Sequence, residues 1–482
     1  MEKVWKYAND ILQKFRCCFS REASYGWFVI VIVGFMLRSD HLGVTSIIRE
    51  LEFNSDKLYQ NLLHFFHSAA WSLKELQKKW LQILNKSDSI IEVFGKPLMI
   101  GDGLKKPKEG KHMPGVKKTH LESGNSSKPE YTMAHLFGAL GIVTGNSIKQ
   151  FCTPISVTIQ DGCRPILEWI KSDFSQDSHV VCLMRQACKA AATMDRACFL
   201  LMDRYFLSVP ALIAMTQEAA IAGREYITLI TRAKSDCVAY KKPGEYRGRG
   251  RPRIKGKEIK LFDLFSTKTD AFIQTKFTLY GKEKEVQYYY INLLWGRKHY
   301  QELRFVLTVI DNIPSILVST DLNLHPEQII QLYCYRFKIE VFFRAFNQCI
   351  AGLNYHFWNK HVPRLNPFES AKAAEEKLAK ITDSKIRESI INTYNATEGF
   401  VMFCCIAIGV VQLCALKFTD EINSSPIRWL RTYTNIVPSE ESTAVCMRKS
   451  FERIINKCPN LGIAEIILQK RRQIVIPLSK VS

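Results

Sequence analysis

The chain has 482 residues, of which 47% are apolar, and only 17 prolines and 24 glycines, which excludes a disordered or collagen-like protein. This length predicts roughly two to four folded domains. The 67 Lys and Arg residues against 46 Asp and Glu give a net charge of +21, so we expect a polyanionic partner, either nucleic acid or an anionic membrane surface.

The 15 cysteines are spread along the chain without a C-x-x-C pair, and several lie in apolar surroundings. A thiol in such surroundings behaves as a small hydrophobe. Without zinc-like spacing or a secretory leader, this pattern predicts reduced thiols in a cytoplasmic protein and no structural zinc site.

Residues 1 to about 90 are predicted to be helical. Residues 44–51 have the period of an amphipathic helix, and a polar break then leads to a helix at 57–66 with Ser55 as its N-cap. Another helix is expected at 71–85. Two helices joined by a short turn are the outline of a helix-turn-helix DNA-binding module, although any small helical bundle shares that outline.

Two apolar runs have the character of membrane segments. The run at 26–37 is too short to span a bilayer, and no small-residue cleavage site follows it. The run at 400–418 is long enough but contains Gln412 and Lys417. We therefore expect both to be buried helices, the second packed on a sheet, and we expect no membrane partner.

An α/β domain is predicted from about residue 90, because short apolar runs alternate with helical stretches. The strand-like runs lie at 96–101, 136–143, 155–159 and 197–202, and the helices at 162–174 and 185–197. Further strand-like runs lie at 226–231, 272–280, 286–294 and 304–310. After Glu340 the chain is expected to be mainly helical to about residue 417, with a mixed tail beyond.

Two basic stretches follow from the composition, of which the first is expected to be a loop region and the second cannot pack a core. The first lies at 104–129 and includes Lys105, Lys106 and Lys111, and the second is Gly-rich, lies at 246–257 and includes Arg249 and Arg251. The Arg-Gly-Arg-Pro sequence in the second resembles the core of an AT-hook, whose arginines enter the minor groove. The alternative is an exposed loop that contacts DNA phosphates.

Two aspartates end apolar, strand-like runs. Asp102 follows KPLMIG and Asp203 follows CFLLM. Neighbouring strand ends in a parallel or mixed sheet would bring both into one crevice, where they would repel each other unless a divalent cation lay between them. Each acid taken singly can also be a cap, a turn residue or a surface group. The rival acids are Asp161, Asp195 and Asp311, of which Asp311 is the strongest.

A helix is expected to begin at Pro326 and to carry Tyr333, Arg336 and Glu340. At about 100° per residue these three side chains fall within roughly 60° of one another. A phenol, a guanidinium and a carboxylate on one face suit a phosphate and a metal ion. Glu340 would then supply a third oxygen ligand to Asp102 and Asp203, and such hard ligands favour Mg²⁺ or Mn²⁺.

Together these motifs resemble the DDE transposases of bacterial insertion sequences. The helix is similar to the YREK signature, Tyr-(2)-Arg-(3)-Glu-(6)-Lys, of one large group of them, and the resemblance extends from about residue 44 to about residue 412. It implies a ribonuclease H-like α/β catalytic domain with a mostly β insertion, preceded by a helical DNA-binding domain and followed by helices. The expected parts are 1–90 (helix-turn-helix-like), 91–204 (first catalytic part), 205–320 (insertion with basic loop), 321–420 (second catalytic part) and 421–482 (tail for dimerisation or DNA contact).

The resemblance also implies an activity. The chain would cleave the ends of a transposon and join the freed 3′-OH to target DNA, with Asp102, Asp203 and Glu340 as catalytic ligands of Mg²⁺ and with Mn²⁺ as a substitute. Its partners would be the terminal inverted repeats, the target duplex and a second copy of the chain, in a bacterial cytoplasm at the nucleoid. A ribonuclease H-like nuclease without strand transfer is an alternative.

Further DNA contacts are expected from Tyr333, Arg336 and Arg344. Trp295 is a candidate for a base-stacking wedge, with a core tryptophan as the alternative. The chain departs from the YREK signature at Asn347, where the family has Lys. Arg344 lies on the same helix face as Glu340 and is the expected replacement. If it does not replace that lysine, the chain is a weakened or inert DNA-binding relative.

Overall fold

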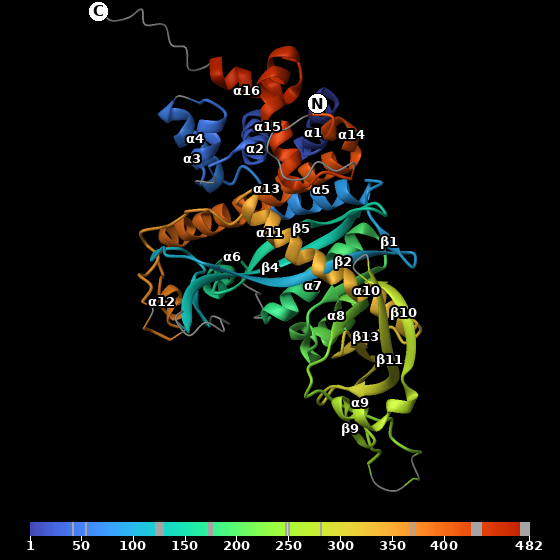
Figure 1. The fold of residues 1–482 in the computed structure, drawn as a ribbon. Coiled ribbons are helices and arrows are strands. Elements are labelled where there is room, and N and C mark those ends of the chain that lie inside the picture. Colours follow the sequence, from blue (N-terminus) through green and yellow to red (C-terminus); the bar gives the residue numbers. More distant parts are fainter. Residues whose placement is uncertain are drawn as a thin grey trace, which may run out of the picture. The chain divides into compact units, whose positions relative to one another are not determined.

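The computed structural model describes residues 1–472 except 41–42, 54, 121–129, 172–176, 246–247, 249–250, 280–281, 367, 371 and 426–435. The chain forms two compact units (Figure 1). The first contains Met1–Ile90, Gly103–Gln176 and Glu340–Ser482, and the second contains Ile91–Asp102 and Asp177–Ile339.

The first unit is rich in helices. Its helices before the sheet are α1 (Glu2–Gln13), the 3-10 helix η1 (Arg16–Cys18), α2 (Glu22–Leu37), α3 (Thr45–Glu50), α4 (Asp56–His67) and α5 (Leu73–Asn85). Its later helices are α6 (Arg164–Ile170), α12 (Ala373–Ala379), α13 (Ser384–Lys417), α14 (Thr419–Asn423), α15 (Glu440–Lys457) and α16 (Gly462–Arg472). The predicted helices at 44–51, 57–66 and 71–85 are confirmed as α3, α4 and α5. Ser55 is the N-cap of α4 by position, but its side chain makes no capping hydrogen bond.

Helix α2 confirms that the apolar run at 26–37 is a buried helix. It is apolar on all sides, which is typical of a helix enclosed within a protein core. It packs against α3, α13, α15 and α16. The N-terminal helices and the C-terminal helices of the chain therefore share one core.

In the first unit, strand β4 (Tyr131–Gly145) pairs antiparallel with both β3 (Lys117–His120) and β5 (Gln150–Asp161). The apolar run at 400–418 belongs to the long helix α13, which lies along β5 as predicted (Figure 1). By length and composition α13 is the one helix among the described residues that could cross a membrane. However, 94% of its most apolar window is buried in the protein, as in the core helix of a folded domain.

Three side chains of α13, spaced seven residues apart, contact β5. A carboxyl oxygen of Glu398 accepts a hydrogen bond from the backbone N–H of Ile159 at 2.6 Å. The Cys405 sulfur lies against the backbone of Val157. Gln412 accepts a hydrogen bond from the Thr153 hydroxyl at 2.8 Å. This spacing fixes the position of α13 along β5.

Small residues let α13 approach the tryptophans of the N-terminal helices. A Cβ atom added at Gly409 would collide with the Trp80 ring, and one at Gly399 would collide with Trp71. Trp80 is fully buried, and its indole N–H donates to the Pro154 carbonyl at 2.8 Å. These two glycines thus permit helix α5 and the segment before it to pack closely on α13.

The second unit contains a mixed sheet. Its parallel part has the order β2, β6, β7, with β2 at Lys96–Pro107, β6 at Cys198–Met202 and β7 at Ile227–Arg232. Strand β2 continues past Asp102 into the first unit. The antiparallel part continues from β7 through β13 (Ile313–Ser319), β12 (Gln301–Ile310), β11 (Lys282–Trp295), β8 (Val238–Tyr240) and β9 (Glu258–Lys260). Strand β1 (Glu92–Val93) pairs with β2, and β10 (Ile273–Leu279) pairs with β11.

Helices of the second unit are α7 (His179–Met194), α8 (Val209–Ala222), α9 (Leu264–Thr267) and α10 (Pro326–Cys334), with 3-10 helices η2 (Arg204–Phe206), η3 (Leu261–Asp263), η4 (Thr269–Ala271) and η5 (Tyr335–Phe337). Helices α7 and α8 pack together, and Arg185 on α7 pairs with Glu218 on α8 at 3.0 Å. Helix α11 (Lys338–Gln348) starts in the second unit and continues into the first.

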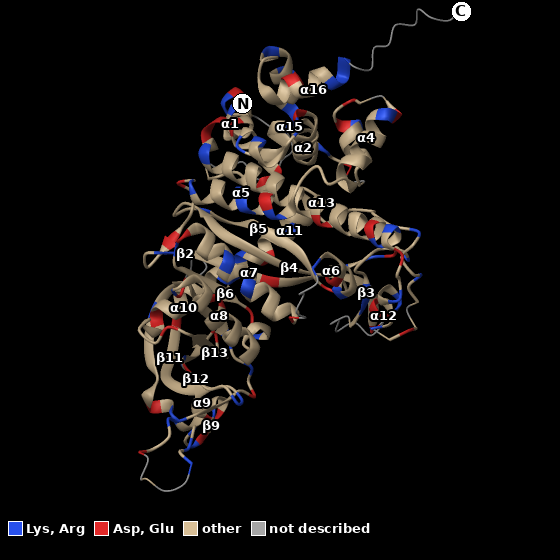
Figure 2. Cartoon of the chain, turned by 180° about the vertical axis from the view of Figure 1, so that it is seen from behind, with Lys and Arg blue, Asp and Glu red and all other residues tan. Residues whose placement is uncertain are grey.

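The strands predicted between Asp203 and Glu340 are confirmed as β7, β10, β11 and β12. Strands β8, β9 and β13 were not predicted. All 15 cysteines are free thiols, as expected. Lys and Arg are scattered over helices and loops of both units (Figure 2), so charge alone does not mark one DNA-binding face.

Candidate functional site

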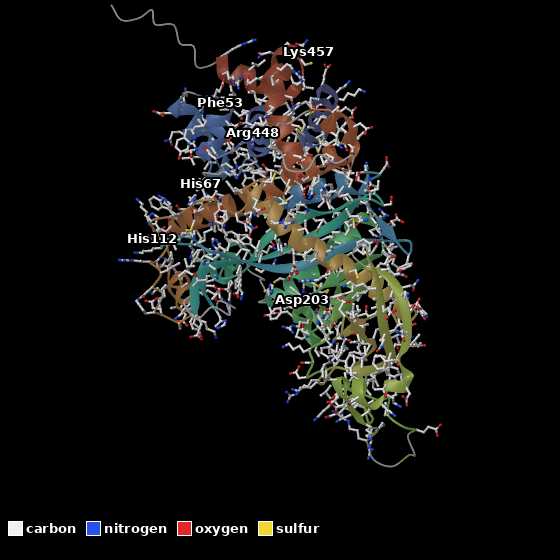
Figure 3. The ribbon with its side chains drawn as sticks, viewed as in Figure 1. Phe53, His67, His112, Asp203, Arg448 and Lys457 are labelled. Atoms are coloured by element: carbon white, nitrogen blue, oxygen red, sulfur yellow. The ribbon has the colours of Figure 1, made fainter. Side chains whose placement is uncertain are left out.

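Strand register sets Asp102 beside Asp203. Strands β2 and β6 are parallel, and the last matched pair is Gly101 with Met202. Asp102 and Asp203 are the next residues of the two chain segments. Asp203, labelled in Figure 3, directly follows β6. Asp203 follows the end of β6, but Asp102 lies within β2, which continues to Pro107, so the strand end predicted at Asp102 is wrong. The two acids still occupy neighbouring positions, each one residue beyond the last matched pair.

This register has an electrostatic consequence. Neighbouring strands lie about 4.8 Å apart, and side chains at matched positions point to the same face of the sheet. Two carboxylates this near repel each other unless a positive charge lies close by. The residues that precede the two acids are buried, from Leu98 to Gly101 in β2 and throughout β6, whereas Asp102 and Asp203 are half-buried and accessible to a ligand.

Arg336 supplies positive charge to this pair. Its guanidinium donates a hydrogen bond to the Asp102 carboxylate at 2.7 Å, and the two side chains are 17% and 18% exposed. Charge-assisted hydrogen bonds of this kind are short and strong. In contrast, the Asp203 carboxylate makes no hydrogen bond or ion pair with any described residue. Its oxygens are therefore open to a cation.

The backbone at Asp203 is held by a residue that the sequence did not point to. The hydroxyl of Thr231 on β7 donates to the Asp203 carbonyl at 2.9 Å, and Thr231 is fully buried. The backbone N–H of Phe206 donates to the same carbonyl at 3.0 Å. A single Thr in a strand gives no sequence signal for such a role, because Thr is common in strands.

The helix from Pro326 is not continuous, which corrects the prediction of one helix through Glu340. Helix α10 ends at Cys334, the 3-10 helix η5 follows, and α11 begins at Lys338. Pro326 occupies the first turn, where its missing N–H costs nothing, and His325 with Gln328 forms a capping box. Because a 3-10 helix has about three residues per turn, the predicted angles between Tyr333, Arg336 and Glu340 do not hold strictly.

Glu340 lies in the first turn of α11 and is exposed. It is the first residue of Glu340–Ser482, the third chain segment of the first unit. Among the described residues, no group of three or more His, Cys, Asp or Glu lies together so as to hold a metal ion. The structure thus brings Asp102, Asp203 and Arg336 together, and Glu340 as a third ligand stays a prediction.

One comparison bears on this arrangement. Residues 14–137 match a family model described as DDE superfamily endonuclease. The matched segment contains Asp102 and ends before Asp203 and Glu340. None of the curated proteins compared with the chain matches it.

The likeness supports a transposase or nuclease type of enzyme with DNA as its substrate. A DDE domain implies a ribonuclease H-like fold, and the mixed α/β architecture with its parallel strands β2, β6 and β7 agrees with it. Enzymes of this kind typically use divalent metal ions.

Each rival acid has a local partner. Asp161 pairs with Lys117 at 2.7 Å, and Asp195 ends α7 and pairs with Arg224 at 2.9 Å. Asp311 lies in the tight turn between β12 and β13, with φ of 51°, and pairs with Lys284. None of these three is next to a second strand-end acid in the described register pairs.

The remaining residues of α11 show how the chain departs from the YREK signature. Asn347 turns back onto its own helix, where its amide donates to the Phe343 carbonyl at 2.9 Å. The Asn347 amide oxygen is buried without a hydrogen-bond partner among the described residues. Arg344 is exposed, and Tyr333 at the end of α10 is half-buried. Position 347 therefore offers no positive charge to a phosphate.

The three lysines predicted to bind DNA differ in how exposed they are and in whether they hydrogen-bond other residues. Lys105 is exposed, and its ammonium donates to the His120 carbonyl at 3.2 Å. Lys106 donates to the Asn354 side chain at 3.3 Å, and burial lowers the pKa of Lys106. Lys111 is exposed. Lys105 and Lys111 are consequently the more accessible of the three.

The other predicted contacts are Arg249, Arg251 and Trp295. Arg249 falls outside the described residues, and Arg251 is exposed. Trp295 is half-buried at the end of β11, neither a fully buried core residue nor a fully exposed one. Its indole is hydrogen-bonded to the Cys237 thiol, whose pKa burial raises to about 11. Its role as a base-stacking wedge stays a prediction.

Proposed function

We propose that the chain is a DDE transposase of the YREK-signature group, which cleaves DNA at transposon ends and joins the freed 3′-OH to target DNA. The observation that carries the proposal is the register of β2 and β6, which sets Asp102 beside Asp203 with Arg336 on Asp102. The match to the DDE endonuclease family, which includes Asp102, supports the same interpretation.

The donor set suits a divalent metal ion. Adjacent, half-buried carboxylates are hard oxygen ligands of the kind that Mg²⁺ prefers, with Mn²⁺ as a substitute. Asp102 and Asp203 would hold the ion, and Glu340, four residues after Arg336, would be the third ligand. When bound, such ions supply Lewis-acid stabilisation of the phosphodiester and activate the attacking water or hydroxyl.

The cationic residues of the helix would bind the phosphates next to the scissile bond. Arg336 can present two N–H groups to a phosphate once Asp102 has another positive partner. Tyr333 can donate its phenol, and the exposed Arg344 can bind two phosphate oxygens in place of the family lysine. These groups orient the scissile phosphate and offset the charge that develops on it.

The wider organisation follows from the same proposal. Helices α3 and α4 would form the DNA-binding module of a domain at 1–90, and the β strands at 205–320 would form an insertion in a catalytic domain built from 91–204 and 321–420. Lys105, Lys106, Lys111, Arg249, Arg251 and Trp295 would contact DNA. The working form would be a homodimer on two inverted repeats, at the nucleoid of a bacterial cytoplasm, with 421–482 as a tail for dimerisation or DNA contact.

One observation favours a second candidate, a DNA-binding relative with weak or no catalysis. Asn347 replaces the lysine of the signature and hydrogen-bonds its own helix. The open carboxylate of Asp203 favours the active enzyme instead. A ribonuclease H-like nuclease would use the same acids but would not join DNA strands.

A strand-transfer assay tests the proposal. The substrate is the DNA that flanks the reading frame, incubated with Mg²⁺ and either wild-type protein, Asp203→Ala or Asp311→Asn. We expect cleavage and joining by wild type and Asp311→Asn, and neither by Asp203→Ala, because Asp311 lies in a surface turn. Cleavage without joining would indicate the nuclease, and binding without cleavage by wild type would indicate the inert relative.

A further inference from the structure

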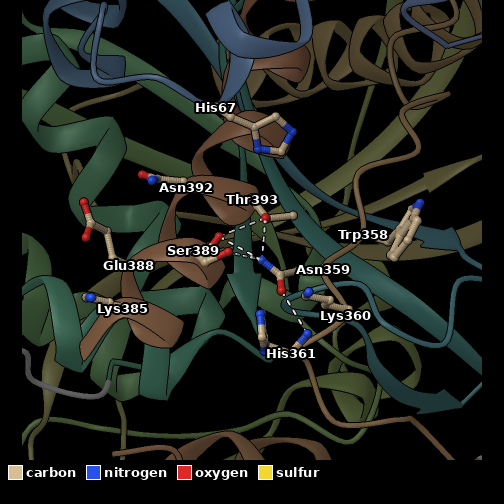
Figure 4. A pocket seen from close by; sticks show the side chains of 10 residues that line it. All are labelled: His67, Trp358, Asn359, Lys360, His361, Lys385, Glu388, Ser389, Asn392 and Thr393. Atoms are coloured by element: carbon tan, nitrogen blue, oxygen red, sulfur yellow. Dashed lines mark hydrogen bonds between the residues drawn. The ribbon is translucent and has the colours of Figure 1, made fainter. Parts of the chain in front are cut away.

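A pocket of about 510 Å³ lies in the first unit, remote in sequence from the two aspartates. Helix α4, the segment at 358–361 and the start of α13 form its walls (Figure 4). Its lining is polar and basic, with one acid among ten residues: His67, Trp358, Asn359, Lys360, His361, Lys385, Glu388, Ser389, Asn392 and Thr393. A cavity of this volume is in the range that holds a small organic ligand.

The backbone before the pocket alternates between the core and solvent. Tyr355, Phe357 and Asn359 are buried, whereas Trp358 and Lys360 are exposed. Such alternation is typical of an extended segment with one face on the core. The buried neighbours of Trp358 therefore direct its indole outward, where 66% of it is exposed.

Asn359 anchors this segment. It is only 8% exposed, and its amide donates to the Ser389 hydroxyl at 2.8 Å and to the Thr393 hydroxyl at 3.1 Å. Its side-chain oxygen accepts from the His361 N–H, and its own N–H donates to the His112 carbonyl at 2.9 Å. Figure 4 shows Asn359 between Trp358 on one side and Lys385 on the other. Trp358 is thus presented from a fixed backbone.

The exposed ring of Trp358 is suited to bind a ligand with a flat, apolar face. An exposed tryptophan gains nothing from core packing, whereas a nucleobase can stack on its ring. Lys360 and Lys385 are both exposed and contribute positive charge, which suits the phosphates on either side of a stacked base. Lys111 adjoins the same segment, because its carbonyl accepts a hydrogen bond from the Leu365 N–H at 3.0 Å.

We propose that this pocket binds an unpaired nucleotide of single-stranded DNA, with the base on Trp358 and the adjoining phosphates on Lys360 and Lys385. The net charge of +21 and the DDE endonuclease match favour DNA over an acidic protein. The site shares no residue with the proposed catalytic acids. Its occupation by DNA requires no cleavage, so it can be tested without divalent ions.

The test measures binding of a fluorescently labelled single-stranded oligonucleotide to the full-length Asp203→Ala protein, in buffer with EDTA, by fluorescence anisotropy. We expect Trp358→Ala in this background to weaken binding roughly fivefold or more, because the base no longer has a ring to stack on. Trp358→Phe should retain most of the affinity. The double variant Lys360→Ala/Lys385→Ala should depend less on salt. The magnitude of the slope of log affinity against log salt concentration should fall by about 0.7 for each phosphate that the protein no longer neutralises.

Matched variants show whether the effect belongs to the pocket. Phe262→Ala removes another exposed aromatic ring and Lys189→Ala another exposed lysine, and both should bind as the parent does. Circular dichroism establishes that each variant is folded. The proposal would be overturned if Trp358→Ala and the double lysine variant bound the single-stranded oligonucleotide with unchanged affinity. It would also be overturned if the protein bound a duplex of the same sequence, or a poly-glutamate peptide, more tightly than the single strand. If the wild-type protein does not cleave DNA in the strand-transfer assay, the proposed function is overturned, but the result of this binding experiment still stands.

Discussion

Arg336 and Asp102 form a 2.7 Å ion pair across 234 positions of the chain, at the point where Asp102 stands next to Asp203. The pair gives the first aspartate a positive partner and leaves the second without one among the described residues. A divalent cation bound by both acids would therefore compete with Arg336 for Asp102. This competition leads to the first prediction.

Replacing Arg336 with Ala should tighten Mn²⁺ binding and lower DNA cleavage on the order of a hundredfold, because the variant has neither the competitor for Asp102 nor the guanidinium that would bind phosphate. Isothermal titration with Mn²⁺ and the cleavage assay measure the two effects. Arg336→Lys keeps the charge and serves as the control, with Mn²⁺ affinity near that of the wild type. Equal Mn²⁺ affinities of Arg336→Ala and wild type would refute the competition.

Arg344 and Asn347 can be tested together. Arg344→Ala should reduce cleavage of transposon ends by roughly tenfold or more, since the variant cannot make a charge-assisted hydrogen bond to the phosphate. Adding Asn347→Lys should restore part of the activity, because it returns the charge of the signature to this helix. An Arg344→Ala protein that cleaves as well as wild type would show that Arg344 does not replace the lysine.

Glu398 should make the stability of the fold depend on pH. Burial raises the pKa of its carboxyl to about 8 in the folded chain, against 4.5 as the ordinary value. The folded state thus keeps a proton that the unfolded state releases, so stability is fully present below about pH 4.5 and falls as pH rises toward 8. Unfolding free energies from urea titrations at pH 5, 6.5 and 8 would measure this decline.

Glu398→Gln removes the titrating group and keeps an acceptor for the Ile159 N–H. We expect its stability to change less between pH 5 and 8 than that of the wild type. Glu388→Gln, an exposed acid of the same helix, should follow the wild-type curve. A Glu398→Gln protein with the full wild-type pH dependence would show that another group is responsible.

Gly409→Ala should destabilise the protein by about 1–3 kcal/mol, because the added methyl group would overlap the buried Trp80 ring. The measurement is the free energy of unfolding in urea. Gly244→Ala is the control, since a Cβ atom there meets nothing within 4 Å, and its stability should match the wild type. Equal stabilities of the two variants would mean that the core around Trp80 rearranges to accommodate the added methyl group at little cost in free energy.

The sequence predicted the secondary structure well where apolar runs were long, but it misplaced the end of β2, which continues past Asp102 to Pro107. The helices of the first 90 residues, the burial of 26–37 and 400–418, and four strands between Asp203 and Glu340 were all predicted from periodicity. Strand β13 was missed because it follows β12 after a turn of two residues in the left-handed region, Asp311 and Asn312, neither of which is glycine. Such a hairpin has no strong sequence signal.

The candidate site was less accessible to sequence reasoning. Sharp strand ends suggested that Asp102 and Asp203 are neighbours, but only the β2–β6 register shows it. The pairing of Arg336 with Asp102 depends on tertiary structure, as does the support that Thr231 gives to Asp203. The break in the helix at η5 was missed because its residues are ordinary helix formers, without Gly or Pro.

The regular spacing of Glu398, Cys405 and Gln412 on α13 has a consequence for solubility. Strand β5 pairs with β4 on one side, and in the described residues no strand pairs with its other side. Such an open edge invites pairing with a strand of another molecule and so promotes aggregation. By holding Ile159, Val157 and Thr153, the three side chains keep a helix over that edge. The edge of β5 is in this way protected from pairing with a strand of another molecule.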